Sequence, residues 1–346
     1  MKDLKYLISY TIPLSALVAL EIQGWFSYAT VIYAFGLIPI LELLLHTQNQ
    51  PYTEAQVSSR LSNRWFDWML YLNLPMVYGI LIYGMYTLVN DPLSNFEITG
   101  LILSLGIVLG TNGINVAHEL GHRTTKSEQF LSKVLLLPSL YIHFFVEHNY
   151  GHHKNVATIE DPATARKNQT VYGFWISSVL GQYQNAWKVQ GQLLRNHNAS
   201  FFSLQNNMLY GLLVELLYLL TIFINVGWIG LSYAIAIAVV SVLLLETINY
   251  IEHYGLLRKM VNGRYERVRT YHSWNSDHVV GRIVLYELTR HSDHHYRASK
   301  KYQILESKDE SPRLPFGYPT SMLIALVPPL WFNLMNPKLQ TTAHSD

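Results

Sequence analysis

The stretch Phe-Glu-Ile-Thr-Gly-Leu-Ile-Leu-Ser-Leu-Gly-Ile-Val-Leu-Gly-Thr-Asn-Gly-Ile-Asn-Val-Ala-His-Glu-Leu-Gly-His, residues 96–122, decides the fold of this chain. Residues 96–117 are mostly apolar and long enough to cross a bilayer as one helix. The pair His118 and His122 follows at once, and residues four apart lie on the same face of a helix. The stretch therefore predicts a membrane-spanning helix whose end carries two potential metal ligands.

Five more apolar stretches have a similar length, at residues 6–23, 25–46, 68–89, 208–226 and 228–250. They predict an all-α integral membrane protein with six transmembrane helices, forming a single membrane domain over residues 1–346. We interpret the first stretch as a retained helix rather than a signal peptide, because no small-residue cleavage site follows it. Two shorter apolar stretches, 130–146 and 322–332, are interrupted by charged, histidine or proline residues. We expect both to be interfacial or packed segments.

Lysine and arginine residues orient these helices. None of the 25 basic residues falls near Gly24, in the loop 90–95 or near Gly227. Because cytoplasmic loops are rich in basic residues, these three loops are predicted to lie outside and the N-terminus inside. The segments 118–206 and 251–320, which hold most of the histidines of the chain, then lie on the cytoplasmic side.

The composition narrows the chemistry. Half of the 346 residues are hydrophobic and only 14% are charged, as in a membrane protein. The chain has no cysteine, which excludes disulfides, thiolate metal sites and iron–sulfur clusters. Any redox reaction must therefore receive its electrons from a separate carrier. A net charge of +2 gives no indication of nucleic-acid binding.

Nine histidines fall into four groups beside the cytoplasmic ends of the spans: His118 and His122; His148, His152 and His153; His253; and His291, His294 and His295. Within each of the three larger groups, residues three or four apart share a helix face and can approach one metal. Nine imidazoles are too many for one ion with about four to six donors, but they suit two ions. We therefore predict a two-metal site at the cytoplasmic face.

Neighbouring polar residues are candidates to orient the ligand rings. Carboxylates that bond the second nitrogen of a ligand histidine fix its tautomer and strengthen its metal bond. Glu147, Glu252 and Asp293 lie within or beside the histidine groups, and His272 is a further candidate for a ligand or a proton path.

Two other classes of protein remain open from these residues. His118-Glu119-Leu-Gly-His122 matches the zinc peptidase pattern, in which Glu119 would activate water. That interpretation leaves seven of the nine histidines unexplained. A metal transporter or sensor would use charged residues inside the membrane, for which Glu42, Glu215 and Glu246 are candidates.

The histidine motifs as a set resemble those of the membrane-bound alkane 1-monooxygenases, relatives of xylene monooxygenase in the integral-membrane fatty acid desaturase and hydroxylase superfamily. The resemblance rests on Glu147-His-Asn-x-Gly-His-His153, Asn249-Tyr-x-Glu-His-Tyr-Gly255 and Arg290-His-Ser-Asp-His-His295, with Asp161-Pro-Ala-Thr and His272-Ser-Trp-Asn-Ser276 beside them. It extends from about the second span to Pro337. Thr289 departs from the glutamine frequent in that family, without affecting a ligand.

The resemblance implies two iron ions held by the nine histidines, with no other cofactor. The enzyme would hydroxylate the terminal methyl of medium- or long-chain alkanes with O2, in a bacterial inner membrane. A rubredoxin, served by its reductase, would supply electrons. Alternatives within the superfamily are a xylene-type aryl-methyl hydroxylase and a fatty acyl desaturase or hydroxylase. The basic residues Arg258, Lys259, Arg264, Arg267 and Arg269 are expected either to attract an acidic carrier or simply to mark the cytoplasmic side.

Overall fold

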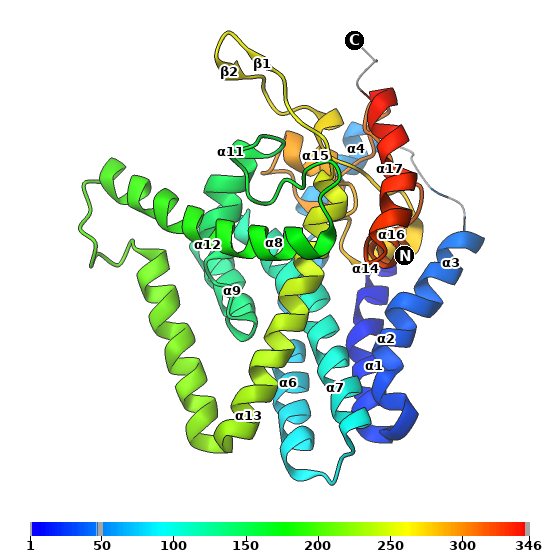
Figure 1. The fold of residues 1–346 in the computed structure, drawn as a ribbon, viewed down its shortest axis with the longest axis vertical. Coiled ribbons are helices and arrows are strands. Elements are labelled where there is room, and N and C mark those ends of the chain that lie inside the picture. Colours follow the sequence, from blue (N-terminus) through cyan, green and yellow to red (C-terminus); the bar gives the residue numbers. More distant parts are fainter. Residues whose placement is uncertain (1, 46, 48–50, 343–346) are drawn as a thin grey trace.

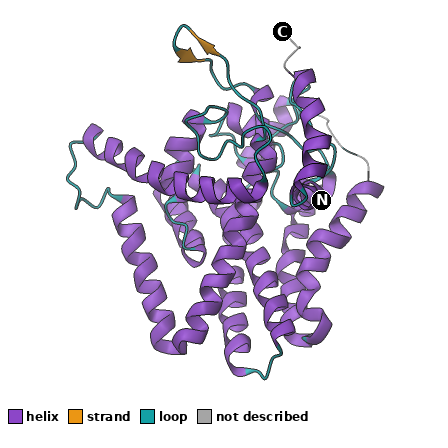
Figure 2. Cartoon of the chain, in the orientation of Figure 1, coloured by secondary structure: helices purple, strands orange, loops and turns teal. Residues whose placement is uncertain are grey.

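The computed structural model describes residues 2–45, 47 and 51–342. This part of the chain is almost entirely helical, and Figure 2 shows one small hairpin projecting from an otherwise α-helical molecule. The hairpin pairs β1 (Met260–Val261) with β2 (Arg264–Tyr265) in antiparallel register. The prediction of an all-α membrane protein is confirmed.

Five helices in the described part of the chain are long and apolar enough to cross a membrane. Most of them are built from shorter helical elements joined end to end. The first joins η1 (Lys2–Tyr10) and α1 (Thr11–Ile22), and the second joins η2 (Gly24–Tyr28), α2 (Ala29–Ile32), η3 (Tyr33–Leu37) and α3 (Ile38–Leu44). The third contains α5 (Trp65–Tyr71) and α6 (Asn73–Asn90), the fourth contains α7 (Asn95–Val108), η4 (Leu109–Ile114) and α8 (Asn115–Gly121), and the fifth is α13 (Asn207–His253).

The fifth of these helices contains two of the six predicted spans. Gly227 inside α13 has φ 67° and ψ −165°, a conformation that glycine adopts at little cost. Figure 1 shows the two limbs of α13 meeting at a turn and both running from it toward the same end of the molecule. The limbs correspond to the predicted spans 208–226 and 228–250. His46, the predicted end of the second span, lies outside the described residues.

The remaining elements gather at one end of the apolar helices, opposite the turn at Gly227 (Figure 1). They are α4 (Glu54–Ser62), α9 (Lys126–Leu136), η5 (Leu137–Ser139), α10 (Phe144–Val146), η6 (Glu147–His152), α11 (His153–Asn155), α12 (Val171–Asn196), η7 (Thr270–His272), α14 (Val279–Val284), α15 (His291–Tyr296), η8 (Tyr302–Ile304), α16 (Tyr318–Ala325) and α17 (Pro328–Thr342). The interrupted stretch 130–146 is divided among α9, η5 and α10, and 322–332 is divided between α16 and α17. Neither forms a spanning helix, as expected.

Close packing between the fourth span and the second limb of α13 aligns the ends that carry histidines. A side chain at Gly106 would meet Val240 at 2.4 Å, so glycine lets the two helices approach. One turn further on, Gly110 faces Leu244. Both helices continue from this contact to the same end of the molecule, where α8 carries His118 and α13 ends at His253.

Candidate metal centre

All nine predicted ligands converge, and they form two clusters. His118, His122, His148, His153 and His294 make the five-histidine cluster, and His152, His253, His291 and His295 make the four-histidine cluster. Within each cluster the ligand nitrogens lie within 4.8 Å of one another. The side chains come from α8 and the residue after it, η6, α11, α13 and α15. The ends of the fourth span and of α13 therefore meet the two segments that follow them in the chain.

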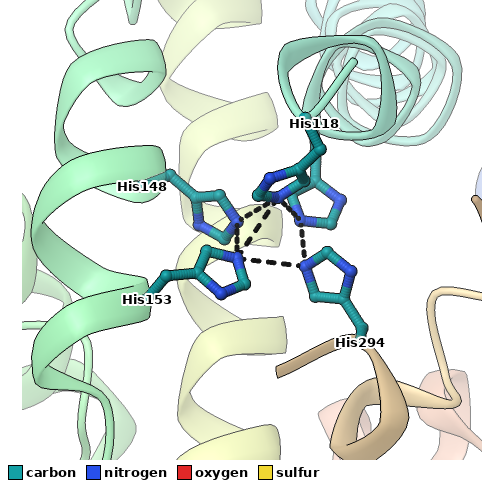
Figure 3. A group of neighbouring side chains, drawn as sticks. His118, His148, His153 and His294 are labelled. Carbon is teal, nitrogen blue, oxygen red and sulfur yellow. Dashed lines mark hydrogen bonds between the residues drawn. The ribbon is translucent and has the colours of Figure 1, made fainter. Parts of the chain in front are cut away.

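The five-histidine cluster has its Nε2 atoms turned inward. Six Nε2–Nε2 separations in this cluster are 3.0–3.2 Å. Figure 3 shows His118, His148, His153 and His294 directing their rings toward one another from different elements. The four-histidine cluster repeats the pattern, with neighbouring Nε2 atoms 2.8–3.2 Å apart.

The two clusters interlock because two of the histidine motifs, 148–153 and 291–295, contribute to both. His153 belongs to the five-histidine cluster and the preceding His152 to the other, and His294 and His295 divide in the same way. The rings of His153 and His295, one from each cluster, have centroids 4.5 Å apart. Part of the division at His152 follows from the wider π-helical turn of η6, which changes the spacing between side chains.

The donor set fits metal ions better than it fits a hydrogen-bonded core. A metal–nitrogen bond of about 2.0–2.1 Å sets neighbouring ligand nitrogens about 3.0–3.4 Å apart, close to the separations seen. A neutral imidazole has only one N–H, so five adjacent Nε2 atoms cannot all bond one another. Burial lowers the pKa of His122 to about 3 and lowers the pKa of His148 and His153 well below the usual value. The rings are therefore neutral and their lone pairs are available to a cation.

Asp161 orients one ligand and was not predicted to do so. Its Oδ2 lies 3.0 Å from Nδ1 of His152, whose Nε2 faces the four-histidine cluster. Thr164 also donates to this oxygen at 2.6 Å. Burial alone would raise the pKa of Asp161, but His152 and Thr164 lower it, so the carboxylate stays ionised. Burial likewise opposes protonation of His152, and Asp161 outweighs it and raises the pKa of that ring.

Glu252 contacts a ligand directly. Its Oε2 lies 3.1 Å from Nε2 of His291, the nitrogen that belongs to the four-histidine cluster. Its other oxygen accepts a hydrogen bond of 2.6 Å from the hydroxyl of Tyr318 on α16. Glu252 therefore lies beside Nε2 of His291, the nitrogen that faces the other histidines of the cluster. The predicted orienting role would instead require a bond to Nδ1, on the other side of the ring.

The three other predicted orienting residues are buried, but their bonds go elsewhere. Glu147 accepts from Asn185 of α12 at 3.2 Å, and burial and the nearby Asp161 raise its pKa to about 8. Asp293 binds the ammonium of Lys300 at 2.6 Å and the backbone N–H of Glu306 at 2.8 Å. These two bonds fix the loop after the last histidine motif.

His272 bonds the loop that follows the hairpin. Its Nδ1 accepts from the backbone N–H of Arg269 at 3.0 Å, and its Nε2 lies 3.3 Å from the carboxylate of Glu266. The structure thus places His272 outside both clusters.

The zinc peptidase and the metal transporter or sensor each required particular carboxylates. In the structure these carboxylates bond other residues of the protein. Glu119 forms an ion pair of 2.8 Å with Arg123 and accepts from the backbone of Tyr302, so it does not face a water site between His118 and His122. Glu42 accepts from the backbone of Gly281, and Glu215 from that of Ile142. Glu246 accepts hydrogen bonds of 3.0 Å from the hydroxyl of Tyr141 and 2.8 Å from the amide of Gln182. These acids brace the helices.

An apolar cavity lies between the spans and reaches His118. Its wall is mostly aliphatic and aromatic, and includes Ile12, Ala34, Phe35, Ile107, Leu244, Leu245, Ile248 and Met322. Thr111 and Asn115 are its polar members besides His118 and Tyr318. A site with so few polar groups suits a hydrophobic small molecule. Because His118 belongs to the five-histidine cluster, the cavity connects the membrane interior to the candidate metal centre.

Fold and site together define an integral membrane protein with a buried centre of two histidine clusters. Residues 96–319 match the family model described as "Fatty acid desaturase". The chain is 38% identical to alkane 1-monooxygenase 1 of Pseudomonas aeruginosa, with 92% of this chain and 84% of the relative covered. It is 35% identical to alkane 1-monooxygenase 1 of Alcanivorax borkumensis, with 93% and 80% covered. The hydroxylase component of a xylene/toluene monooxygenase from Pseudomonas putida is 28% identical, with 98% and 90% covered.

The chain therefore belongs to the alkane 1-monooxygenases within the fatty acid desaturase family. It is an oxidoreductase of the monooxygenase type. The resemblance first seen in the histidine motifs is confirmed over most of the chain.

Proposed function

We propose that this protein is a non-haem di-iron monooxygenase that converts medium- and long-chain alkanes to 1-alkanols. The observation that supports this most directly is the apolar cavity that ends at a ligand histidine, His118. An alkane offers no polar group for recognition, so an apolar wall that leads to a metal ligand is the arrangement its oxidation needs.

Iron is the metal that we propose for both clusters, because a monooxygenase needs a redox-active ion. Imidazole donors alone suit iron, copper, nickel or zinc. Iron held by the five-histidine cluster and by the four-histidine cluster would supply the redox chemistry that activates O2. The overall reaction consumes the alkane, O2, two electrons and two protons, and yields the alcohol and water.

The residues of the cavity bind and orient the substrate. Ile107 and His118 both line it and lie eleven residues apart on one nearly continuous helix, about 16 Å at 1.5 Å per residue. An alkyl chain laid along this wall has one end at His118. The aliphatic lining excludes water from that end, which protects a reactive oxidant from side reactions. Ala34 contributes to the cavity wall.

Electrons are proposed to come from rubredoxin, with its reductase, at the surface around the β1–β2 hairpin. Arg258 anchors this hairpin by donating to the backbone carbonyl of Glu266 at 3.2 Å and to that of Lys154 at 2.9 Å. Lys154 directly follows His153, so the bond from Arg258 holds the base of the hairpin beside the five-histidine cluster. The basic residues at 258–269 favour an acidic partner at this surface.

The topology follows from the same proposal. We propose six crossings of the bacterial inner membrane, with the two limbs of α13 as separate spans and with the N-terminus in the cytoplasm. Segments 118–206 and 251–320 then form the cytoplasmic part. The basic residues support this orientation, since none lies near the turns at Gly24, 90–95 or Gly227.

The test is product analysis with purified protein in lipid vesicles, supplied with O2, rubredoxin, its reductase and a mixed panel of substrates. We expect 1-alkanols from alkanes, no product without the carrier, and loss of product in His152→Ala. His197→Ala, at an exposed position outside both clusters, serves as the matched control. Oxidation of methylarenes or fatty acids in preference to alkanes would contradict the assignment and favour the corresponding relatives.

A further inference from the structure

The long helix α12 has an apolar stripe that is exposed in the described part of the chain. Ile176 and Leu180, one helical turn apart, are 68% and 59% exposed. Tyr172 and Tyr183 continue the same line at the spacing of one helix face. The opposite, buried side of α12 packs inward, where Gln182 bonds Glu246 and Asn185 bonds Glu147. The stripe is therefore additional to the face that stabilises the fold.

A second exposed stripe on the same helix is polar. Ser177, Gln184, Lys188 and Arg195 are all exposed and lie beside the apolar stripe. The helix thus has three faces: one buried in the protein, one exposed and apolar, and one exposed and polar with basic residues. A helix with apolar and basic exposed sides is typical of the membrane–water interface.

The direction of α12 agrees with this location. Figure 1 shows α12 running across the ends of the spans rather than along them.

The apolar stripe is continuous with the membrane-facing surface of the spans. Trp187 of α12 stacks on Phe201 in the following loop, with ring centroids 6.2 Å apart and planes 12° apart. Phe202 and Leu204 come next and are 77% and 85% exposed. The first limb of α13 follows, and its Leu212, Leu213, Leu216 and Leu217 are exposed apolar residues on a helix long enough to span.

We propose that α12 and the loop 197–206 form a lipid-binding surface that lies in the headgroup layer of the leaflet on the metal side. The apolar stripe faces the acyl chains, and Lys188 and Arg195 face the anionic headgroups. Aromatic residues such as Trp187 and Phe201 are favoured at this depth. Through Asn185 and Gln182, the same helix then fixes the depth of the histidine clusters relative to the lipid.

The chain has no cysteine, so single-cysteine variants can be spin-labelled without background. Ile176→Cys and Leu180→Cys probe the apolar stripe, and Ser177→Cys and Gln184→Cys are matched controls on the polar stripe. Each labelled protein is placed in vesicles of phosphatidylethanolamine and phosphatidylglycerol. Accessibility to O2, which concentrates in lipid, and to a water-soluble nickel chelate is then measured. Leu217→Cys and Asp309→Cys provide membrane and water references.

We expect the O2-to-nickel accessibility ratio to be several-fold higher at 176 and 180 than at 177 and 184, and close to that at 217. Ratios at 176 and 180 that equal the ratio at 309 would overturn the proposal. Low accessibility to both reagents, with spin–spin broadening between labels, would also overturn it and indicate that a second copy covers the stripe. The readout depends on neither metal nor turnover, so its outcome is separate from that of the proposed function.

Discussion

Nδ1 of His152 lies 3.0 Å from Oδ2 of Asp161, nine residues further along the chain, while Nε2 of the same ring faces His295. Because the two ring nitrogens are distinct, a donor bond from Nδ1 leaves the lone pair of Nε2 free for a metal. Both side chains are buried, so water does not compete for this bond. Asp161 thereby sets the tautomer of one ligand in the four-histidine cluster.

Replacing Asp161 with asparagine is expected to weaken metal binding by about 10–100-fold, because the residue that orients a metal-binding histidine and raises its basicity is lost. The measurement is iron retained per chain during competition with a chelator. Asp309→Asn, at a fully exposed carboxylate, is the matched control. Retention by Asp161→Asn equal to that of the control would show that the bond does not serve the metal.

Removing the carboxylate of Glu119 is expected to destabilise the protein rather than to stop a hydrolytic reaction. Glu119 and Arg123 form a buried ion pair of 2.8 Å, and breaking such a pair by removing one partner costs about 3–5 kcal/mol. Thermal unfolding of Glu119→Gln in detergent should show this loss. The double variant Glu119→Gln with Arg123→Met should recover part of it, because no unpaired charge remains. Unchanged stability of the single variant would refute the structural role.

Filling the cavity should act on the longest substrates first. Ala34→Phe places a large side chain on the cavity wall. We expect it to reduce hydroxylation of the longest accepted alkane more than that of the shortest, with iron content unchanged. Val239→Phe, which adds a similar volume at a half-exposed position of α13, is the control. A uniform loss across all chain lengths would indicate general damage instead of a shortened cavity.

Charge reversal at the hairpin should weaken the use of the electron carrier. We expect Arg264→Glu combined with Arg267→Glu to raise the KM for rubredoxin and to reduce the dependence of the rate on ionic strength, because steering between opposite charges is screened by salt. Arg195→Glu on α12 is the comparison. If both variants behave like the wild type, the positive charge only marks the cytoplasmic side.

The metal-free protein should lose stability in mild acid. Burial lowers the pKa of His122 to about 3 and that of His143 to about 4. In the unfolded chain a histidine has a pKa of about 6.5. The unfolded chain therefore takes up protons first as the pH falls, and stability is lost progressively between about pH 6.5 and pH 3. Thermal midpoints of chelator-treated protein at a series of pH values test this. A midpoint that stays constant below pH 6 would contradict it.

Much of the site could be predicted from sequence because its ligands are local pairs. The spacing of His118 and His122, or of His291 and His295, is one helical turn, so their convergence follows from helix geometry. The lengths of the apolar stretches and the positions of the basic residues predicted that all four histidine groups lie on the cytoplasmic side. What the spacing could not show is the partition into clusters, since His152 and His153 are neighbours in sequence but belong to different clusters.

The orienting contacts were harder to predict because they are long-range or depend on loop geometry. The hydroxyl of Tyr318 reaches Glu252 across 66 residues of chain. Asp161 was visible as part of the motif Asp161-Pro-Ala-Thr, and its bond to His152 depends on the loop between η6 and α12. The nearness of Asp293 to two histidines in sequence was misleading, because on α15 its side chain points to Lys300.

The most direct test of this account is the iron and zinc content per chain of protein purified from iron-replete cells, measured together by plasma mass spectrometry. The proposed di-iron monooxygenase predicts about two iron ions per chain, one for each histidine cluster, and no stoichiometric zinc. A single metal ion per chain, or zinc in place of iron, would contradict it.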